Sequence, residues 1–277
     1  MLFGAHVSVA GGVQNAPINA AAIGCEVFQV FTRSPQGGNV PKLTDQNIKE
    51  FLENCKKYKQ KEWYVHTPFF INFASANPRI KHASISVVRE ELERASLLKA
   101  KYLMTHLGSY KDLGKEKGLL QVVDSLDKML MGYKGETKFL IEISAGSGEI
   151  IGDTFEEIAE IIHHPKLKKY KIGVCFDTQH AFASGYDLRN EIAVKKTFTE
   201  FDKVIGLENL KLSHCNDSLT ELGSHKDRHA HIGQGLIGKV GFEAIVKNKK
   251  LKDINFVLET EYDLIAEDLK LLKKIRN

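Results

Sequence analysis

The chain has 277 residues, of which 43% are hydrophobic and 27% charged, with a formal net charge of +4 and an isoelectric point of about 8.7. This composition excludes a disordered chain, because it supplies enough apolar residues for a large buried core. The small basic excess suits a polyanionic partner without requiring one, and no apolar run is long enough to predict a membrane-spanning helix.

Short apolar runs rich in β-branched and aromatic residues alternate along the chain with longer amphipathic stretches. The short runs predict eight strands, at residues 2–7, 27–32, 63–66, 102–106, 139–143, 172–176, 210–214 and 255–258. Helical spacing of apolar side chains is clearest over residues 47–58, 83–99, 119–131, 154–162 and 264–275. Capping residues support two of these helix starts, since Thr44 and Asp45 open the first helix and Asp153 and Thr154 precede Glu156 in the fourth.

The alternation of strands with helices implies a parallel sheet, and eight such units imply that the sheet closes into a barrel. An open doubly wound sheet is the main rival, but the first strand is followed by Ala10-Gly11-Gly12, which predicts a tight turn, and not by a GxGxxG motif. No repeat or Pro/Gly/Ser-rich linker divides the chain. We therefore expect an α/β fold in which residues 1–277 form one (β/α)8 TIM barrel.

The four cysteines lie far apart and form no CxxC pair. This spacing argues against both a disulfide framework and a cysteine zinc knuckle. The first residues also lack the basic and apolar segments of a secretory signal. We expect a cytoplasmic protein that does not associate with a membrane.

Residues that commonly bind metals recur where the predicted strands end, from the third strand to the eighth. They are His66, His106, Glu142, Asp177, His180, His214 and Glu259. A single histidine at a strand end is more often structural than a metal ligand, and a single glutamate more often caps a helix or faces solvent. In a barrel, however, all these ends open onto one face. Several carboxylates buried there are costly unless cations neutralise them, so the pattern predicts a metal cluster.

The one long irregular stretch, residues 216–238, adds Asp227 and His229 to this set. Histidine and carboxylate ligands without thiolates suit Zn²⁺, and also Mn²⁺ or Fe²⁺. A catalytic ion takes roughly three to five ligands. Nine candidates therefore suffice for two or three metals that share a bridging carboxylate.

Five motifs are distinctive in combination: residues 4–8 (GAHVS), 173–187 (GVCFDTQHAFASGYD), 214–218 (HCNDS), 227–229 (DRH) and 258–260 (LET). Together they resemble endonuclease IV, the type-IV apurinic/apyrimidinic (AP) endonucleases, over essentially the whole chain. The resemblance implies a zinc-dependent hydrolase of the deoxyribonuclease IV type that acts as a monomer in base excision repair. Its substrate would be double-stranded DNA, cut 5′ to an abasic site to give a 3′-hydroxyl and a 5′-deoxyribose phosphate, with trimming of blocked 3′ ends.

The resemblance also implies three zinc ions per chain and a ligand set for each. These sets are His66, His106 and Glu142; Glu142, Asp177, His214 and Glu259; and His180, Asp227 and His229. Glu142 would bridge two zinc ions beside the attacking hydroxide, which makes it the catalytic carboxylate. His6 would lie near the site without binding a metal, as a candidate supporting residue.

Departures from the family pattern lie in the DNA-contacting loops rather than among the ligands. Phe69 replaces a tyrosine that enters the duplex, and Gln36 lies where an arginine fills the gap left by the missing base. Leu107 replaces a proline, and Ile143-Ser144 replace an Asn-Thr pair. We expect altered DNA affinity or damage preference with the chemistry retained. The DNA-binding candidates are Phe69, Asn72, Gln36 and Arg228.

Two other functions fit parts of the pattern. A divalent-metal sugar isomerase or epimerase of the same barrel type would use Glu, Asp and His ligands at strand ends. It needs only one or two metals and gives His180, Asp227 and His229 no task. A non-catalytic protein that grips damaged DNA with the same mouth is the second alternative, but the complete ligand set argues against it.

Overall fold

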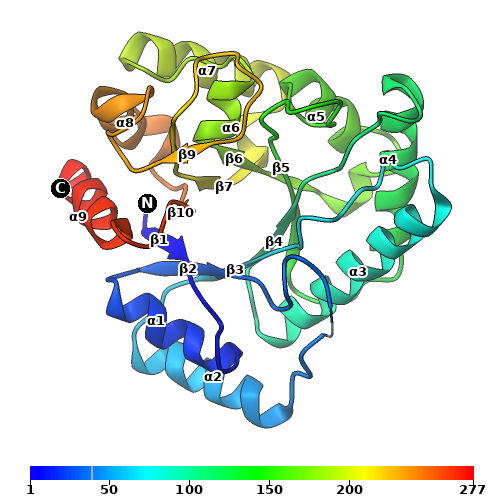
Figure 1. Ribbon diagram of the computed structural model, residues 1–277, viewed down its shortest axis with the longest axis horizontal. Coiled ribbons are helices and arrows are strands. Elements are labelled where there is room, and N and C mark those ends of the chain that lie inside the picture. The colour runs from blue at the N-terminus through cyan, green and yellow to red at the C-terminus, as the bar shows by residue number, and fades with distance from the viewer. Residues whose placement is uncertain (39) are drawn as a thin grey trace.

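A computed structural model describes residues 1–38 and 40–277. Its fold is a closed barrel of eight parallel strands (Figure 1). The barrel strands are β1 (Phe3–His6), β2 (Val27–Val30), β3 (Trp63–His66), β4 (Tyr102–Thr105), β5 (Lys138–Glu142), β6 (Gly173–Asp177), β7 (Leu210–His214) and β10 (Phe256–Leu258). Each pairs with its neighbours in the order β1-β10-β7-β6-β5-β4-β3-β2, and β2 returns to β1. The expected single (β/α)8 barrel is confirmed, and each observed strand falls within about one or two residues of its predicted ends.

Helices surround this barrel as an outer ring (Figure 1). The ring helices are α1 (Ala16–Ala22), α2 (Asp45–Lys57), α3 (Pro78–Leu97), α4 (Lys115–Leu130), α5 (Phe155–Ile162), α7 (Glu191–Val204), α8 (Gly238–Lys247) and α9 (Ile265–Arg276). The short, fully buried α6 (Thr178–Ala183) follows β6 directly and lies inside this ring (Figure 1). Short 3-10 turns lie at Val13–Asn15, Lys168–Tyr170, Leu207–Asn209 and Lys249–Leu251. All five predicted helices are present, whereas α1, α6, α7 and α8 were not predicted.

The strand period of two explains how the fold positions a site. Alternate strand residues point outward to the helices, and the others fill the inside of the barrel with a small apolar cluster. This inner cluster consists of Val27, Tyr64, Tyr102, Met104, Leu140, Cys175, Leu212 and Val257. In these seven strands, the inward position two residues beyond the cluster lies at the carboxyl end of the strand. Those positions hold Gln29, His66, His106, Glu142, Asp177, His214 and Glu259.

The long irregular stretch contains a two-residue hairpin ladder, in which β8 (Asp217–Ser218) pairs antiparallel with β9 (His229–Ala230). The buried carboxylate of Asp217 organises the rest of this stretch by accepting hydrogen bonds from backbone N–H groups. The donors are Ser218, Gly233, Gly235, Ile237 and Gly238, at 2.8–3.3 Å. The stretch is therefore an ordered loop that carries His229 to the barrel mouth.

Two further observations concern possible membrane-spanning helices and the cysteines. Over residues 1–38 and 40–277, no helix combines the length and the apolar character that crossing a bilayer requires. The four cysteines are free and buried.

Candidate metal centre

Eight of the nine predicted ligand residues form three groups at the barrel mouth. In each group, one potential ligand atom per residue lies within 4.8 Å of the others. The groups are His66, His106 and Glu142; Glu142, Asp177, His214 and Glu259; and Asp177, His180 and His229. Glu142 and Asp177 each belong to two groups, so the three groups form one continuous cluster.

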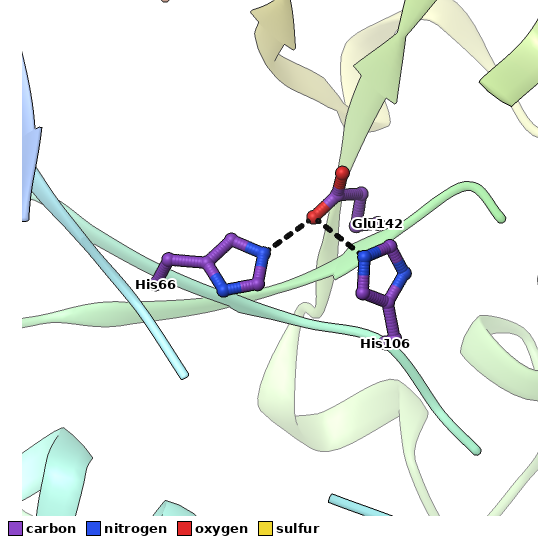
Figure 2. A group of neighbouring side chains, drawn as sticks. All are labelled: His66, His106 and Glu142. Carbon is purple, nitrogen blue, oxygen red and sulfur yellow. Dashed lines mark hydrogen bonds and ion pairs between the residues drawn. The ribbon is translucent and has the colours of Figure 1, made fainter. Parts of the chain in front are cut away.

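The first group is built around one oxygen of Glu142 (Figure 2). His66 Nε2 lies 2.8 Å from Glu142 Oε2, and His106 Nε2 lies 3.6 Å from the same oxygen. The two imidazoles come from the ends of β3 and β4 and point toward the carboxylate from different sides (Figure 2). Glu142 and His66 are buried, so this oxygen is shielded from bulk water.

The second group is built around His214 Nδ1 and the other oxygen of Glu142. The imidazole nitrogen lies 2.8 Å from Glu142 Oε1, 3.2 Å from Glu259 Oε2 and 3.8 Å from Asp177 Oδ2. The two oxygens of Glu142 therefore face different groups, as a bridging carboxylate requires.

The third group differs in one member from the set expected for the third zinc. His180 and His229 are grouped with Asp177, while the exposed Asp227 lies beside both imidazoles. Its carboxylate is 3.3 Å from His180 Nε2 and 3.4 Å from His229 Nε2. His229 Nε2 is also 4.0 Å from Asp177 Oδ2. Asp177 thus faces both the second and the third group.

Two buried nitrogens of this group have no hydrogen-bond partner among the described residues: His180 Nε2 and His229 Nε2. A buried polar atom without a partner is costly, and the usual reasons are an ion, a water molecule or a catalytic role. Both atoms face carboxylates in a cluster that contains only nitrogen and oxygen donors. The cluster therefore fits divalent metal ions of the Zn²⁺, Mn²⁺ or Fe²⁺ type.

The electrostatics of the cluster keep Glu142 ionised. Burial alone would raise the pKa of the Glu142 carboxyl, but His106 and His214, with hydrogen bonds from His180 and His214, hold it well below its usual range. Burial lowers the pKa of His106 to about 4, which leaves its imidazole neutral at neutral pH. An ionised carboxylate and a neutral imidazole are the forms that bind metals.

Thiolates take no part in this cluster. Cys175 lies inside the barrel beneath it, and burial raises the pKa of its thiol to about 11. The thiol is therefore protonated at neutral pH, while metal binding requires the thiolate. The donor set is restricted to imidazole nitrogens and carboxylate oxygens.

Several groups that support the ligands were not predicted. His66 Nδ1 donates to Thr67 O at 2.6 Å and His180 Nδ1 donates to Ile143 O at 3.0 Å, so that Nε2 of each ring faces the cluster as its potential metal ligand. The buried Asn216 donates to Asp177 Oδ2 at 2.7 Å and accepts from Glu259 N at 2.8 Å. A backbone carbonyl that accepts a hydrogen bond cannot be recognised from a sequence. The side chain of Asn216 is different, because it belongs to the HCNDS motif.

His6 lies at the edge of the cluster. Its Nδ1 is 3.0 Å from Gln29 Nε2 and 3.9 Å from Glu259 Oε1, and its ring packs against Phe31 with centroids 4.3 Å apart. Burial, with smaller contributions from His66 and His214, lowers the pKa of His6 to about 3. None of the three metal groups found among the described residues includes His6.

The four candidate DNA-binding residues lie on loops beyond the strand ends. Phe69 is 67% exposed and packs edge-on against Phe31, while its backbone N–H donates to Pro35 O at 3.2 Å. This bond joins the loop after β3 to the loop that carries the exposed Gln36.

The other two candidates differ from each other in exposure. Arg228 is exposed on the long loop and donates from Nη1 to Asp227 O at 2.6 Å. Asn72 is half-buried, and its side-chain oxygen accepts from Ala74 N at 3.0 Å. This bond gives Asn72 a structural role in its own loop.

Comparisons with known proteins agree with this architecture. The family described as Xylose isomerase-like TIM barrel matches residues 18–275. The probable endonuclease 4 of Halothermothrix orenii is 38% identical over 278 residues, which cover 100% of this chain and 99% of the relative. The probable endonuclease 4 of Nitrosopumilus maritimus has the same identity and coverage.

Solved structures give the same result. Endonuclease IV from Thermus thermophilus has a TM-score of 0.88 and 30% identity, covering 99% of this chain and 98% of that structure. A D-tagatose 3-epimerase-like protein has a TM-score of 0.75 at 20% identity over 99% of this chain and 97% of its own, which shows the fold alone. From the full-length similarity to its relatives and the matching barrel, the chain belongs to the endonuclease IV family of Xylose isomerase-like TIM barrels.

Proposed function

We propose that this chain is a metal-dependent AP endonuclease of DNA base excision repair. It would hydrolyse the phosphodiester bond 5′ to an abasic site in double-stranded DNA and leave a 3′-hydroxyl and a 5′-deoxyribose phosphate. The observation that carries this proposal is the cluster of imidazoles and carboxylates around Glu142 at the mouth of the barrel. The full-length relatives named probable endonuclease 4 support the choice of a nuclease.

We further propose three zinc ions per chain, with Mn²⁺ or Fe²⁺ able to replace zinc at some positions. Their ligands would be the three groups at the barrel mouth, with Asp227 completing the third. When bound, such ions act as Lewis acids that activate water and stabilise the charge developing on the attacking and leaving oxygens. The carboxylates of this mouth would repel a phosphodiester, and bound cations would offset that repulsion.

The protein's own residues hold this arrangement in place. Glu142 presents one oxygen to His66 and the other to His214, at 2.8 Å each, so its side chain fixes the spacing of the first two groups. The pKa of the Glu142 carboxyl, held well below its usual range by the surrounding imidazoles against the effect of burial, keeps both oxygens available. Replacing this residue should therefore disturb two metal positions at once.

DNA recognition would come from the loops above the cluster. We propose that the exposed Phe69 enters the duplex as an aromatic wedge, and that Gln36 and Arg228 contact the sugar-phosphate backbone. Asn72 could contribute only through its amide N–H groups, since its oxygen already serves the loop. A nucleotide without a base costs least to move out of the stack, which favours abasic sites as substrates.

The same hydrolysis applied to a terminal phosphoester would trim blocked 3′ ends. One chain supplies every proposed ligand, so the centre needs no second subunit and we propose a monomer. The four free cysteines suit a reducing compartment, and we propose that the enzyme acts in the cytoplasm.

Sugar epimerisation is the alternative that the barrel type offers. It is disfavoured by the third group, because an enzyme with one or two metals would give Asp227 and His229 no role. The epimerase structures that resemble this chain are 13–20% identical to it, so they inform only about the fold.

The test uses an end-labelled duplex with a single tetrahydrofuran abasic analogue, beside the same duplex without the lesion. The zinc-loaded protein should cut the first duplex once, 5′ to the lesion, and leave the second intact. A polymerase should extend the product, because its 3′ end is a hydroxyl. Incision that leaves a 3′-phosphate, or turnover of ketohexoses in place of DNA, would contradict the proposal.

A further inference from the structure

Gln29 is a fully buried glutamine at the inward-facing end of β2, among the candidate metal ligands. Its side chain contacts three residues of the barrel mouth. Nε2 lies 2.7 Å from Glu259 Oε1 and 3.0 Å from His6 Nδ1, and Oε1 lies 2.8 Å from His214 Nε2. One amide thus joins two members of the same metal group, His214 and Glu259.

The chemistry of Glu259 fixes which way this amide points. A carboxylate accepts hydrogen bonds and has none to donate, so the NH2 end of Gln29 must face Glu259. The reverse orientation would place two acceptor oxygens 2.7 Å apart. The carbonyl oxygen of Gln29 therefore faces His214, and this assignment follows from the donors and acceptors alone.

The orientation of the amide in turn fixes the state of His214. Because Gln29 Oε1 can only accept, His214 Nε2 must carry a proton and donate it. The opposite nitrogen, Nδ1, faces Glu142, Glu259 and Asp177, at 2.8, 3.2 and 3.8 Å, and is the nitrogen left to bind a metal. His66 and His180 are fixed the other way, with Nδ1 bonded to a backbone carbonyl and Nε2 facing the cluster.

We propose that Gln29 is a positioning residue for the second metal group. It holds His214 in the tautomer that binds metal through Nδ1, and the same amide restrains Glu259 Oε1. The proposal deepens the proposed metal-dependent function and rests on it. Gln29 touches neither metal nor DNA in this role, so it acts only through His214 and Glu259. Partners of this kind typically change metal affinity about 10–100-fold when removed.

The test compares Gln29→Met with Gln60→Met. Methionine keeps nearly the same length and volume but provides no amide. Gln60 is also buried, and its side chain donates to Cys25 O at 3.3 Å, away from the metal groups. We expect Gln29→Met to weaken one zinc site about 10–100-fold in chelator competition. Gln60→Met should bind every zinc ion with wild-type affinity.

A second readout separates positioning from a purely structural effect. Long-range ¹H–¹⁵N NMR of the zinc-loaded protein reports which nitrogen of each histidine carries the proton, with His214 assigned from the signal lost in His214→Asn. Wild type should show His214 protonated at Nε2 with Nδ1 bound to metal. In Gln29→Met this signal should shift or split, while the signals of His66 and His180 stay in place.

The outcomes distinguish this proposal from the function on which it rests. Equal zinc affinity in Gln29→Met and wild type, or a wild-type His214 protonated at Nδ1, would overturn the role of Gln29 while leaving the metal centre intact. A wild-type chain that binds no divalent metal would overturn both.

Discussion

At the scale of single residues, the carboxylate of Asp217 organises the long loop that carries Asp227 and His229. An asparagine in its place would turn an NH2 group toward backbone N–H donors that need an acceptor. We expect Asp217→Asn to lower the free energy of unfolding by about 2–5 kcal/mol, because several buried N–H groups lose a charged partner. Urea denaturation of the metal-free protein measures this, with the exposed Asp253→Asn as the control.

The same variant should also weaken the third metal group before the others, since His229 and Asp227 lie on this loop. Zinc content after partial chelation would reveal the order of loss. A change in stability below about 0.5 kcal/mol, the range of ordinary surface substitutions, would show that Asp217 does not organise the loop.

Phe69 permits a second test at this scale, because it is 67% exposed and contributes little to the core. We expect Phe69→Ala to weaken binding to abasic duplex by about 1–3 kcal/mol, the range for loss of one aromatic stacking contact. The unfolding free energy should remain nearly unchanged. Fluorescence anisotropy with a labelled duplex measures the affinity, and Leu97→Ala, also an exposed apolar residue, is the control. Equal affinities for the two variants would remove Phe69 from the DNA interface.

The ligand residues of the candidate centre could largely be predicted from the sequence, but the groups that hold those ligands in place could not. The ligand types were predictable because histidines and carboxylates at successive strand ends have few structural explanations in combination. Gln29 was not predicted, since a glutamine within an apolar strand has no distinctive chemistry until the inward register is known. Thr67 and Ile143 contribute through backbone oxygens, which no side-chain pattern reveals. Asp177 faces two groups, which only the three-dimensional structure could establish.

At the scale of elements, α3 anchors the loop that follows β2 through a buried ion network. Glu91 on α3 accepts from Arg33 Nε at 2.6 Å and from the hydroxyl of Thr32, and Arg94 Nε lies 3.4 Å away. We expect Glu91→Gln to lower the free energy of unfolding by about 3–5 kcal/mol, because Arg94 loses its buried counter-charge and Arg33 keeps only the exposed Glu90, 2.8 Å from its Nη2. The exposed Glu93→Gln on the same helix should cost less than about 1 kcal/mol.

Thermal or urea unfolding of the two variants checks this difference. The loop after β2 carries Gln36 and contacts Phe69, so Glu91→Gln should also reduce DNA affinity. Equal stability of the two glutamate variants would show that the network does not anchor the loop.

How well the sequence predicts each helix or strand depends on which of its faces are buried. Strands were predicted because continuous β-branched runs are typical of a sheet covered on both faces. Helix α3 begins earlier than expected, since Asn77 caps a first turn led by Pro78 that lacks apolar periodicity. Helix α6 is buried on every side, so it shows no amphipathic pattern at all. This helix nevertheless carries His180 to the cluster.

At the scale of the whole molecule, the reactivity of the four cysteine thiols indicates whether the core of the barrel is closed to reagents. Burial raises the pKa of Cys25 to about 12 and that of Cys175 to about 11, and it also raises the pKa values of Cys55 and Cys215. A raised thiol pKa means that the unreactive protonated form persists up to that pH. At pH 8 the native protein should therefore react very slowly with a thiol reagent such as DTNB, and all four thiols should react after unfolding. Rapid reaction of native protein would contradict the closed core.

The whole barrel takes part in one site, since the carboxyl ends of the barrel strands β3, β4, β5, β6, β7 and β10 supply the cluster around Glu142. The most direct measurement is incision of a labelled abasic duplex by wild type and by Glu142→Gln, with full metal analysis of both proteins. The account predicts that wild type carries two or three zinc ions and cuts 5′ to the lesion, while Glu142→Gln loses at least one ion and the incision. A wild-type protein that is loaded with metal and leaves the abasic duplex intact would contradict it.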